Sequence, residues 1–235
     1  MKSMGSNYKM KRTMLKLFLI ATTISVLLLF SGCLLEEGKS ISLYTRVIVT
    51  ATDNDTYDTE MGSYYEYQDE DINLDNTAII LVDTWAYHQN DGWSERLEDN
   101  LKNKIAPLLT LARKYGMTII HAPTNHEISD IVAPIEGELV ESNPDKLTKY
   151  LERNNISTLI YAGYASNMCL LTKPAGIFNM KYLGYDIILL RDCTIAFELP
   201  YTLENELSNQ IAISIVELSK SRTSTLDDLR DALEQ

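Results

Sequence analysis

From residue 77 onward the chain alternates short apolar runs with amphipathic stretches, and this order constrains the fold more than any other feature. The first run, Thr77–Val82, reads TAIILV and is continuous and largely β-branched. Such a run is typical of a strand that is buried on both faces of a parallel sheet. The repeated alternation of strand and helix predicts a doubly wound, three-layer α/β sandwich with a mostly parallel sheet of five to six strands.

The same patterns predict the order of the elements. Pro107 is expected to kink the first long helix. We expect main strands at 77–82, 117–121, 157–162 and 186–190, short strands near 138–140 and 222–223, and helices at 94–115, 145–154, 167–183, 204–218 and from 224.

The N-terminal 32 residues have the features of a secretory signal. Basic residues between Lys9 and Lys16 precede an apolar run of 14 residues at 17–30, which is shorter than the ~20 residues that span a bilayer. The string LLFSGC resembles a prokaryotic lipoprotein processing site with Cys33 as the lipidated residue. This interpretation predicts an extracytoplasmic lipoprotein that is anchored to the membrane by acyl chains. An uncleaved anchor, or a signal followed by a chance cysteine, remains an alternative.

The charge of the chain excludes one class of function. Without residues 1–32, which hold five basic side chains and no acidic one, 16 basic residues face 33 acidic ones, a net charge of −17 over 203 residues. A nucleic-acid binder needs clustered Lys and Arg, so no nucleic-acid partner is expected. Residues 33–74 are polar and acidic without a helical period, and they predict a tether and an extended arm packed on a domain at 75–235.

The predicted topology indicates where chemistry should lie. Sites in doubly wound sheets form outside the carboxyl ends of the strands. Asp83 directly follows the first strand, and Cys169 falls in the first turn of the helix after the third, where a thiolate is favoured. Asp83 could accept the proton of Cys169, which would activate the sulfur as a nucleophile. From position alone, a capping role for Asp83 and inert packing for Cys169 remain open.

Other candidate groups carry weaker signals. The three histidines, His88, His121 and His126, have no spacing that fits a metal motif, so neither a metal nor another cofactor is expected. Cys193 is interpreted as packing, although an extracytoplasmic location also allows a disulfide between Cys169 and Cys193.

Three segments carry a resemblance to a known family. They read TAIILVDTWAYHQN at 77–90, GMTIIHAPTN at 116–125 and YAGYASNMCLLTKPAGIFNMKYLGYDIILLRDCTIAF at 161–197. The chain resembles the isochorismatase-like cysteine hydrolases, which include nicotinamidases and N-carbamoyl amide hydrolases. An Asp-x-Trp-x-x-His string and an Asn-Met-Cys string followed by a basic residue and Pro are similar to one subgroup.

The resemblance implies a mechanism. Cys169 would attack an amide carbonyl after giving its proton to Asp83, and water would hydrolyse the resulting thioester. The backbone N–H groups of Ala165 and Cys169 would form the oxyanion hole, beside a cis peptide bond between Tyr164 and Ala165. The small-molecule substrate would be contacted by Trp85, His88, Tyr164 and Asn167. Family members often oligomerise, so the resemblance also allows a homo-oligomer.

One departure from the family affects the functional hypothesis. The family's third catalytic residue is a Lys, but no Lys occurs between Lys114 and Lys146, and a glutamate falls near its place (Glu136, Glu138 or Glu141). The main hypothesis is a cysteine hydrolase that cleaves a small amide-type C–N bond. The alternatives are a degenerate, non-catalytic member that binds a small ligand or partner, and a vinyl ether hydrolase acting on a compound such as isochorismate.

Overall fold

The computed structural model describes residues 38–50, 62–86, 91–124 and 126–235, and residues 39–235 form one compact unit. The strands are β1 Ser40–Thr50, β2 Ser63–Asn73, β3 Thr77–Val82, β4 Thr118–Ala122, β5 Leu139–Val140, β6 Thr158–Tyr164, β7 Asp186–Ile195 and β8 Arg222–Ser224. The α-helices are α2 Asp91–Asn100, α3 Ala106–Lys114, α4 Pro144–Arg153, α5 Cys169–Thr172, α6 Ile177–Tyr182, α7 Leu207–Leu218 and α8 Leu226–Glu234.

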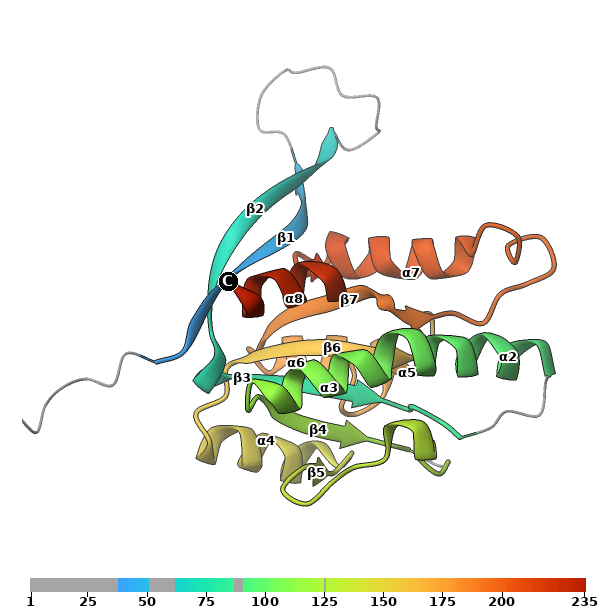
Figure 1. The fold of residues 1–235 in the computed structure, drawn as a ribbon. Helices are drawn as coiled ribbons and strands as arrows, with labels where there is room; N and C mark the ends of the chain where they lie inside the picture. The colour runs from blue at the N-terminus through green and yellow to red at the C-terminus, as the bar shows by residue number, and fades with distance from the viewer. Residues whose placement is uncertain (1–37, 51–61, 87–90, 125) are drawn as a thin grey trace, which may run out of the picture. The chain divides into compact units, whose positions relative to one another are not determined.

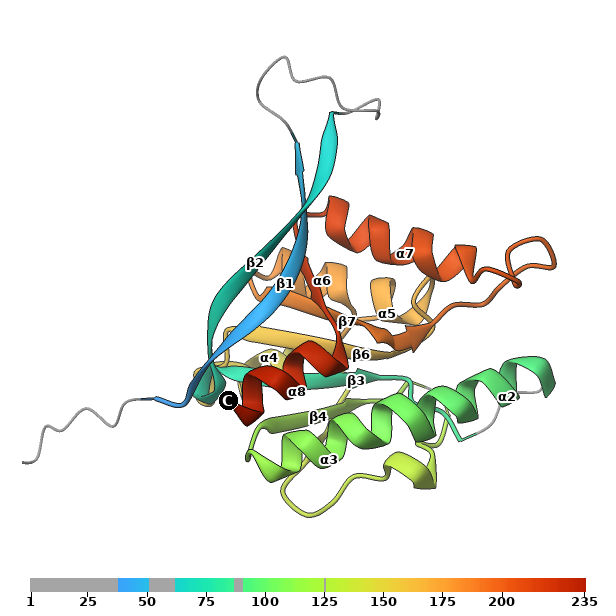
Figure 2. The same cartoon turned by 45° about the horizontal axis from the view of Figure 1, so that its top comes forward.

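Within the described residues the strands form one sheet in the order β2-β1-β8-β7-β6-β3-β4-β5. The strands from β8 to β5 run parallel, whereas β1 pairs antiparallel with both β8 and β2. Helices α2, α3 and α8 cover one face, and α5, α6 and α7 lie on the other (Figures 1 and 2). The prediction of a doubly wound, mostly parallel α/β sandwich is therefore confirmed.

The predicted count of five to six strands is wrong, because the described sheet has eight. Most of the difference comes from β1 and β2, which pair along their whole length as a long hairpin in the region predicted to be an arm. Alternate side chains of β1 face the core, with Leu43 and Thr45 buried, whereas β2 is mostly exposed and polar. The alternation of buried and exposed side chains in β1 is typical of a strand. However, its second neighbour in the sheet, β8, lies nearly 180 residues away in the sequence.

Two predicted helices are divided in the structure. The helix expected at 94–115 consists of α2, a π-helical segment at Leu101–Ile105 and α3, so the irregular turn lies just before Pro107. The helix expected at 167–183 consists of α5 and α6, which are separated by a segment containing Pro174 and Gly176. Proline lacks the N–H that a continuous helix needs, and this accounts for the break.

The core lies between the sheet and the two helical layers. All six residues of β3 are buried, as its continuous apolar sequence predicted, and its neighbours β4 and β6 are buried along most of their length. Among the described residues, no helix combines the length and the hydropathy needed to span a bilayer. The predicted signal at 1–32 and the predicted lipidation site Cys33 lie outside the described residues.

Candidate active site

The carboxyl ends of β3 and β6 meet where the order of the strands reverses. The two strands pair in parallel, and Val82 is the partner of Gly163. Gly163 has φ +112°, and a Cβ there would lie 2.1 Å from the carbonyl oxygen of Val82. Only glycine fits this position. The close contact between Gly163 and Val82 places the loop after β3 beside the loop after β6.

Asp83 begins the first of these loops. It is fully buried, and its φ of +50° places its backbone in the left-handed region. Asp is among the few non-glycine residues that adopt this conformation readily. The carboxylate accepts a hydrogen bond from Thr124 N–H at 2.8 Å, and the Thr124 hydroxyl lies 2.7 and 2.9 Å from its two oxygens. A buried carboxylate is thus held by donors from the loop after β4.

Thr124 is a site residue that the sequence reasoning missed. It follows β4 by two residues and therefore lies at a strand end, where functional side chains were expected. A neutral hydroxyl in this loop lacks the charge that identifies a catalytic cation in a sequence.

Cys169 lies opposite Asp83, at the first residue of α5. The side chain of Asp83 lies close enough to the Cys169 thiol to raise the thiol pKa. Burial first, and then the proximity and the negative charge of Asp83, raise the pKa of Cys169 to about 11. The expectation that the helix terminus would favour a thiolate is therefore wrong, because burial and the neighbouring carboxylate outweigh it. The resting pair is a thiol and a carboxylate.

The backbone before Cys169 has the geometry that the resemblance implied. The peptide bond between Tyr164 and Ala165 is cis. The backbone N–H of Ala165 lies near the sulfur of Cys169 and lowers the thiol pKa against the larger opposing effects. In the part of the chain that the structure describes, neither Ala165 N–H nor Cys169 N–H bonds a carbonyl oxygen. Both donors therefore remain available beside the sulfur.

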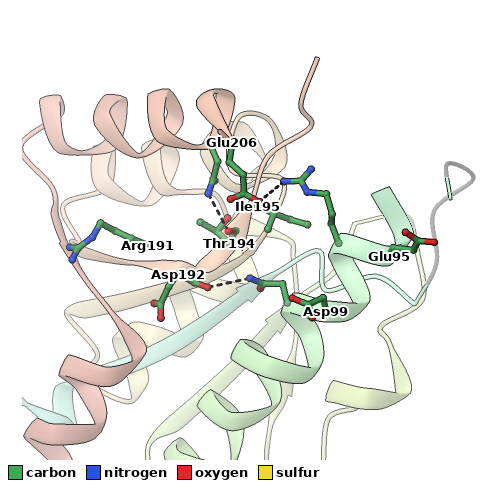
Figure 3. A pocket seen from close by; sticks show the side chains of 10 residues that line it. Glu95, Asp99, Arg191, Asp192, Thr194, Ile195 and Glu206 are labelled. Atoms are coloured by element: carbon green, nitrogen blue, oxygen red, sulfur yellow. Dashed lines mark hydrogen bonds and ion pairs between the residues drawn. The ribbon is translucent and has the colours of Figure 1, made fainter. Parts of the chain in front are cut away.

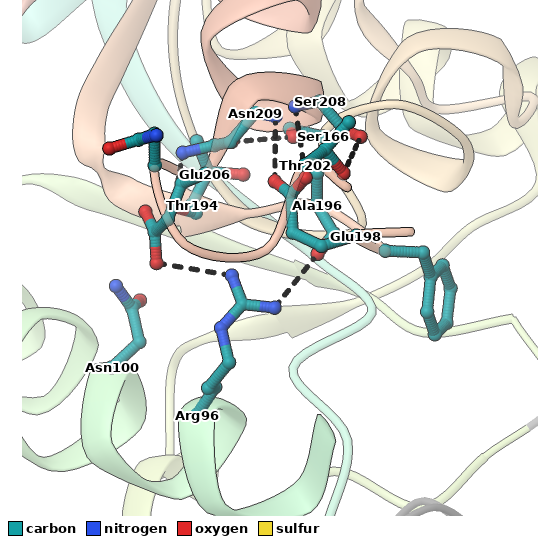
Figure 4. A network of polar contacts seen from close by, with 12 residues as sticks. Arg96, Asn100, Ser166, Thr194, Ala196, Glu198, Thr202, Glu206, Ser208 and Asn209 are labelled. Atoms are coloured by element: carbon teal, nitrogen blue, oxygen red, sulfur yellow. Dashed lines mark hydrogen bonds and ion pairs between the residues drawn. The ribbon is translucent and has the colours of Figure 1, made fainter. Parts of the chain in front are cut away.

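A buried polar network fixes this segment from the side of α7 (Figure 4). The hydroxyl of Ser166 donates to Asn209 Oδ1 at 2.6 Å, and Ser166 N–H bonds the carbonyl of Ile195. The carboxylate of Glu198 accepts the backbone N–H groups of Ser208 and Asn209, each at 2.9 Å. The loop between β7 and α7 is thereby tied to the residue next to Ala165.

The four predicted substrate contacts have different surroundings. Tyr164 is fully buried and its hydroxyl donates to Asn100 Oδ1 at 2.9 Å, so it faces α2. The side chain of Asn167 exchanges hydrogen bonds of 3.0 and 3.1 Å with the backbone of Phe197, which makes it a brace between two loops. Trp85 is nearly buried and packs edge-on against His126 at 5.2 Å. His88 lies outside the described residues.

An aromatic cluster flanks the site. The ring of Phe197 lies 6.3 Å from that of Trp85 and stacks on Trp93 at 4.0 Å. Trp85 follows Asp83 by two residues, and Phe197 is bonded to Asn167, which precedes Cys169 by two. The cluster therefore connects the Asp83 loop and the Cys169 loop to a cavity of 790 Å³. Trp93, Phe197, Leu199 and neighbouring residues line this cavity.

An ionic cluster includes Glu138, one of the glutamates that the sequence puts near the place of the family's lysine. Arg113 holds both oxygens of Glu138 at 2.7 and 3.0 Å, and His121 Nε2 lies 2.9 Å from the same carboxylate. Burial opposes the ionisation of Glu138, but the bonds from Arg113 and His121 outweigh it and lower the pKa of Glu138 to about 2. Burial lowers the pKa of His121 despite its acidic partner, which favours the neutral ring at pH 7.

The other glutamates and lysines of this region face outward. Glu136 is exposed, and Glu141 caps the turn before α4 and lies 3.5 Å from the exposed Lys146. Lys173 is the lysine whose charge acts on Cys169, and it lowers the thiol pKa only slightly compared with burial and Asp83.

A second cavity of 460 Å³ lies between α2, the end of β7 and the start of α7 (Figure 3). Its wall is polar and includes Arg96, which bonds Glu206 and the Ala196 carbonyl. Neither Asp83 nor Cys169 lines either cavity.

The described residues contain neither a disulfide nor a candidate metal site. Cys169 and Cys193 are both free thiols, so the structure contains no disulfide between them. Cys193 is fully buried, in agreement with its interpretation as packing. Over the same residues, no group of three His, Cys, Asp or Glu side chains is arranged to hold a metal ion.

Comparison with solved structures identifies the fold of this chain. No protein-family model matches the sequence, and no curated protein does. Among solved structures, a cysteine hydrolase from Pseudomonas syringae has a TM-score of 0.57 at 17% identity and covers 69% of this chain and 94% of its own. An isochorismatase-like hydrolase from Alkaliphilus metalliredigens has a TM-score of 0.53 at 16% identity, covering 67% and 98%. An isochorismatase family protein from Desulfovibrio vulgaris has a TM-score of 0.52 at 16%, covering 68% and 99%.

These likenesses concern backbone geometry at low sequence identity. Over the 67–69% of the chain that these structures cover, the protein therefore has the fold of the isochorismatase-family hydrolases, as the sequence resemblance implied.

Proposed function

We propose that this protein is a cysteine hydrolase that cleaves an amide-type C–N bond of a small molecule through a thioester on Cys169. The observation that carries the proposal is the buried pair of Asp83 and Cys169 at the strand-order reversal, where the Asp83 side chain acts directly on the thiol. A base in hydrogen-bond contact with a thiol is the arrangement that activates a weak nucleophile. The likeness to hydrolase structures supports the same chemistry.

The pair accounts for each proton in the reaction. As the sulfur attacks the carbonyl carbon, an S–C bond forms and the thiol proton passes to Asp83. The C–N bond then breaks, and Asp83 returns this proton to the nitrogen, so that ammonia or an amine leaves. Water next gives a proton to Asp83 and attacks the thioester. The acid leaves, and the proton returns to the sulfur.

The backbone supplies the charge stabilisation. The negative charge that develops on the carbonyl oxygen would be bound by the N–H groups of Ala165 and Cys169, which lie beside the sulfur and bond no carbonyl oxygen. A donor aimed at a developing oxyanion is typically worth about 3–4 kcal/mol of barrier.

The N-terminal 32 residues support an extracytoplasmic location for the proposed activity. The basic stretch, the apolar run at 17–30 and the string ending at Cys33 support a lipoprotein that is tethered outside the cytoplasm. The enzyme would then act on small amides in the extracytoplasmic space without spanning the bilayer.

The experiment uses the full-length protein, purified in detergent. Ammonia release is measured on a panel of small primary amides and N-carbamoyl amino acids, with Cys169→Ala and Asp83→Asn as test variants and Cys193→Ala as the matched cysteine control. The proposal predicts release by the wild type and the control and none by either test variant. Hydrolysis that persists in Cys169→Ala would contradict the thioester mechanism.

A second function, ligand binding without turnover, is favoured by one observation. The pKa of Cys169 is raised to about 11, and the region expected to hold the activating lysine contains the Arg113–Glu138 pair, whose charge is already balanced. Saturable binding of panel amides by both the wild type and Cys169→Ala, with no ammonia released by any variant, would support this second function.

A further inference from the structure

The cavity of 790 Å³ lies between α2 and the loop from β7 to α7. Its volume is within the range of small-molecule sites, which is about 300–1,000 Å³. The wall is mostly apolar and includes Trp93, Phe197, Leu199, Pro200 and Leu203. Leu199 and Leu203 are 51% and 50% exposed, so a bound molecule would remove aliphatic surface from water.

A row of aromatic rings borders this cavity. The ring of Phe197 stacks on that of Trp93, with the centroids 4.0 Å apart and 24° between the planes, and it lies 6.3 Å from the ring of Trp85. Trp85 follows Asp83 by two residues, so the row runs from the candidate catalytic pair to the cavity. Flat aromatic groups are preferred partners of such rings, because offset-stacked and edge-to-face contacts add to the burial of apolar surface.

The charged side chains of the wall do not favour an anionic ligand. Arg96 bonds Glu206 at 3.1 Å and the Ala196 carbonyl at 3.3 Å (Figure 4). Glu198 accepts two backbone N–H groups at the start of α7, and Glu95 is exposed and adds a negative charge. Among the described residues that line the cavity, Arg96 is the one cation. A substrate carboxylate would therefore have to compete with Glu206 for it.

Two hydrogen bonds tie the wall of the cavity to the segment that carries the nucleophile. The side chain of Asn167 donates to the carbonyl of Phe197 at 3.0 Å and accepts the N–H of Phe197 at 3.1 Å. Asn167 precedes Cys169 by two residues, so the backbone of Phe197 is held close to the loop that ends at the sulfur. The cavity is thereby placed to hold a group that is attached to an amide reacting at Cys169.

We propose that this cavity is the subsite for an uncharged aromatic group of the substrate, so that the enzyme selects aryl-substituted amides over aliphatic and anionic ones. The inference deepens the proposed function and rests on it. A cationic group fits less well than a neutral one, because the guanidinium of Arg96 already lies 5.7 Å from the centre of the Trp93 ring and repels a second cation.

The test measures binding by titration calorimetry to full-length Cys169→Ala protein in detergent, which is expected not to turn over. Phenylacetamide is expected to bind at least threefold tighter than cyclohexylacetamide, which has a similar size but no aromatic ring, and more than tenfold tighter than the anion malonamate.

Variants in the same background locate the binding. Phe197→Leu removes a ring and keeps the apolar character, and it should weaken the binding of phenylacetamide more than fivefold. Leu203→Asp puts a charge on a half-exposed part of the wall and should have an effect of the same size, so the test does not depend on the folding of one variant. Tyr201→Leu is the matched control, because Tyr201 is in the same loop, is 79% exposed and does not line the cavity.

Equal binding of phenylacetamide and cyclohexylacetamide would overturn the proposal, and so would an affinity that neither Phe197→Leu nor Leu203→Asp lowers. Tighter binding of betaine amide, which carries a trimethylammonium group, would overturn the assignment of an uncharged ligand. Calorimetry needs no turnover, so the two proposals fail separately. Selective aryl binding without hydrolysis by the wild type contradicts the hydrolase alone, and hydrolysis without aryl preference contradicts the subsite alone.

Discussion

Thr124 holds the carboxylate of Asp83 with both its N–H and its hydroxyl, at distances of 2.7 to 2.9 Å. Asp83 is fully buried at the end of β3, and Thr124 follows β4, so the contact joins two neighbouring strand ends. The same carboxylate acts on the Cys169 thiol and raises the thiol pKa. Neutral donors thus satisfy the buried base of the proposed pair.

Replacement of Thr124 by valine is expected to destabilise the protein. Valine has nearly the same shape but lacks the hydroxyl, so the buried carboxylate of Asp83 loses a donor. The expected loss is about 1–3 kcal/mol in the free energy of unfolding, measured by urea denaturation. Thr124→Ser keeps the hydroxyl and should recover most of the loss. Equal stability of the valine and serine variants would show that the hydroxyl does not support Asp83.

The reactivity of Cys169 should rise when Asp83 is neutralised. Asp83 raises the thiol pKa through its proximity and its negative charge, so Asp83→Asn should lower that pKa and increase the thiolate fraction at pH 8. Because a less basic thiolate is also less nucleophilic, each unit of decrease should speed alkylation by iodoacetamide only about threefold. The rate is measured at the Cys169 peptide by mass spectrometry, with buried Cys193 as the internal reference. Slower labelling in Asp83→Asn would contradict the assigned contact.

Glu138 should stabilise the fold in a defined pH range. Its pKa is lowered to about 2 in the folded protein, so its contribution is present above its unfolded value near 4.5 and is lost as the pH falls toward 2. Glu138→Gln is expected to cost about 2–3 kcal/mol at pH 7, and its deficit relative to the wild type should shrink between pH 5 and pH 3. Urea denaturation across this range measures the difference. Glu136→Gln, at an exposed neighbouring position, should change little at any pH, and a constant deficit for Glu138→Gln would refute the linkage.

The contact between Ser166 and Asn209 should affect both stability and catalysis. Asn209→Ala removes the acceptor of a buried 2.6 Å hydrogen bond next to Ala165, with an expected cost of about 1–3 kcal/mol in unfolding free energy. Since Ser166 adjoins the proposed oxyanion donor, kcat should fall more than KM rises. Asn205→Ala, on the exposed loop before α7, is the matched control. A variant with lower stability and normal kcat would limit Asn209 to a structural role.

The central architecture could be predicted from the sequence because its signals are local. The continuous apolar run of β3 is buried in full, and the strand ends that topology selected contain Asp83 and Cys169. The hairpin of β1 and β2 was not predicted, because its place in the sheet depends on pairing Arg46 with Thr223, far along the chain. The sequence pattern of a strand indicates which of its faces is buried, but it does not indicate which distant strand pairs with it.

The details of the site were harder to predict, since they depend on packing in three dimensions. Tyr164 was expected to contact substrate, yet the turn of the chain after Gly163 directs its hydroxyl to Asn100. The raised pKa of Cys169 results from burial and from the proximity of Asp83, and neither quantity is visible in a local pattern. Thr124 has an ordinary residue type at a favourable place, and only its distance to Asp83 identifies it.

The most direct test of the account is the intact mass of the full-length protein, quenched during turnover of an amide that it hydrolyses. The account predicts a population heavier by the acyl group of the substrate, with the label mapped to Cys169, and no such population in Asp83→Asn. A turning-over enzyme that forms no adduct, or an adduct that Asp83→Asn forms at the wild-type rate, would contradict the claim that Asp83 and Cys169 act as a catalytic pair.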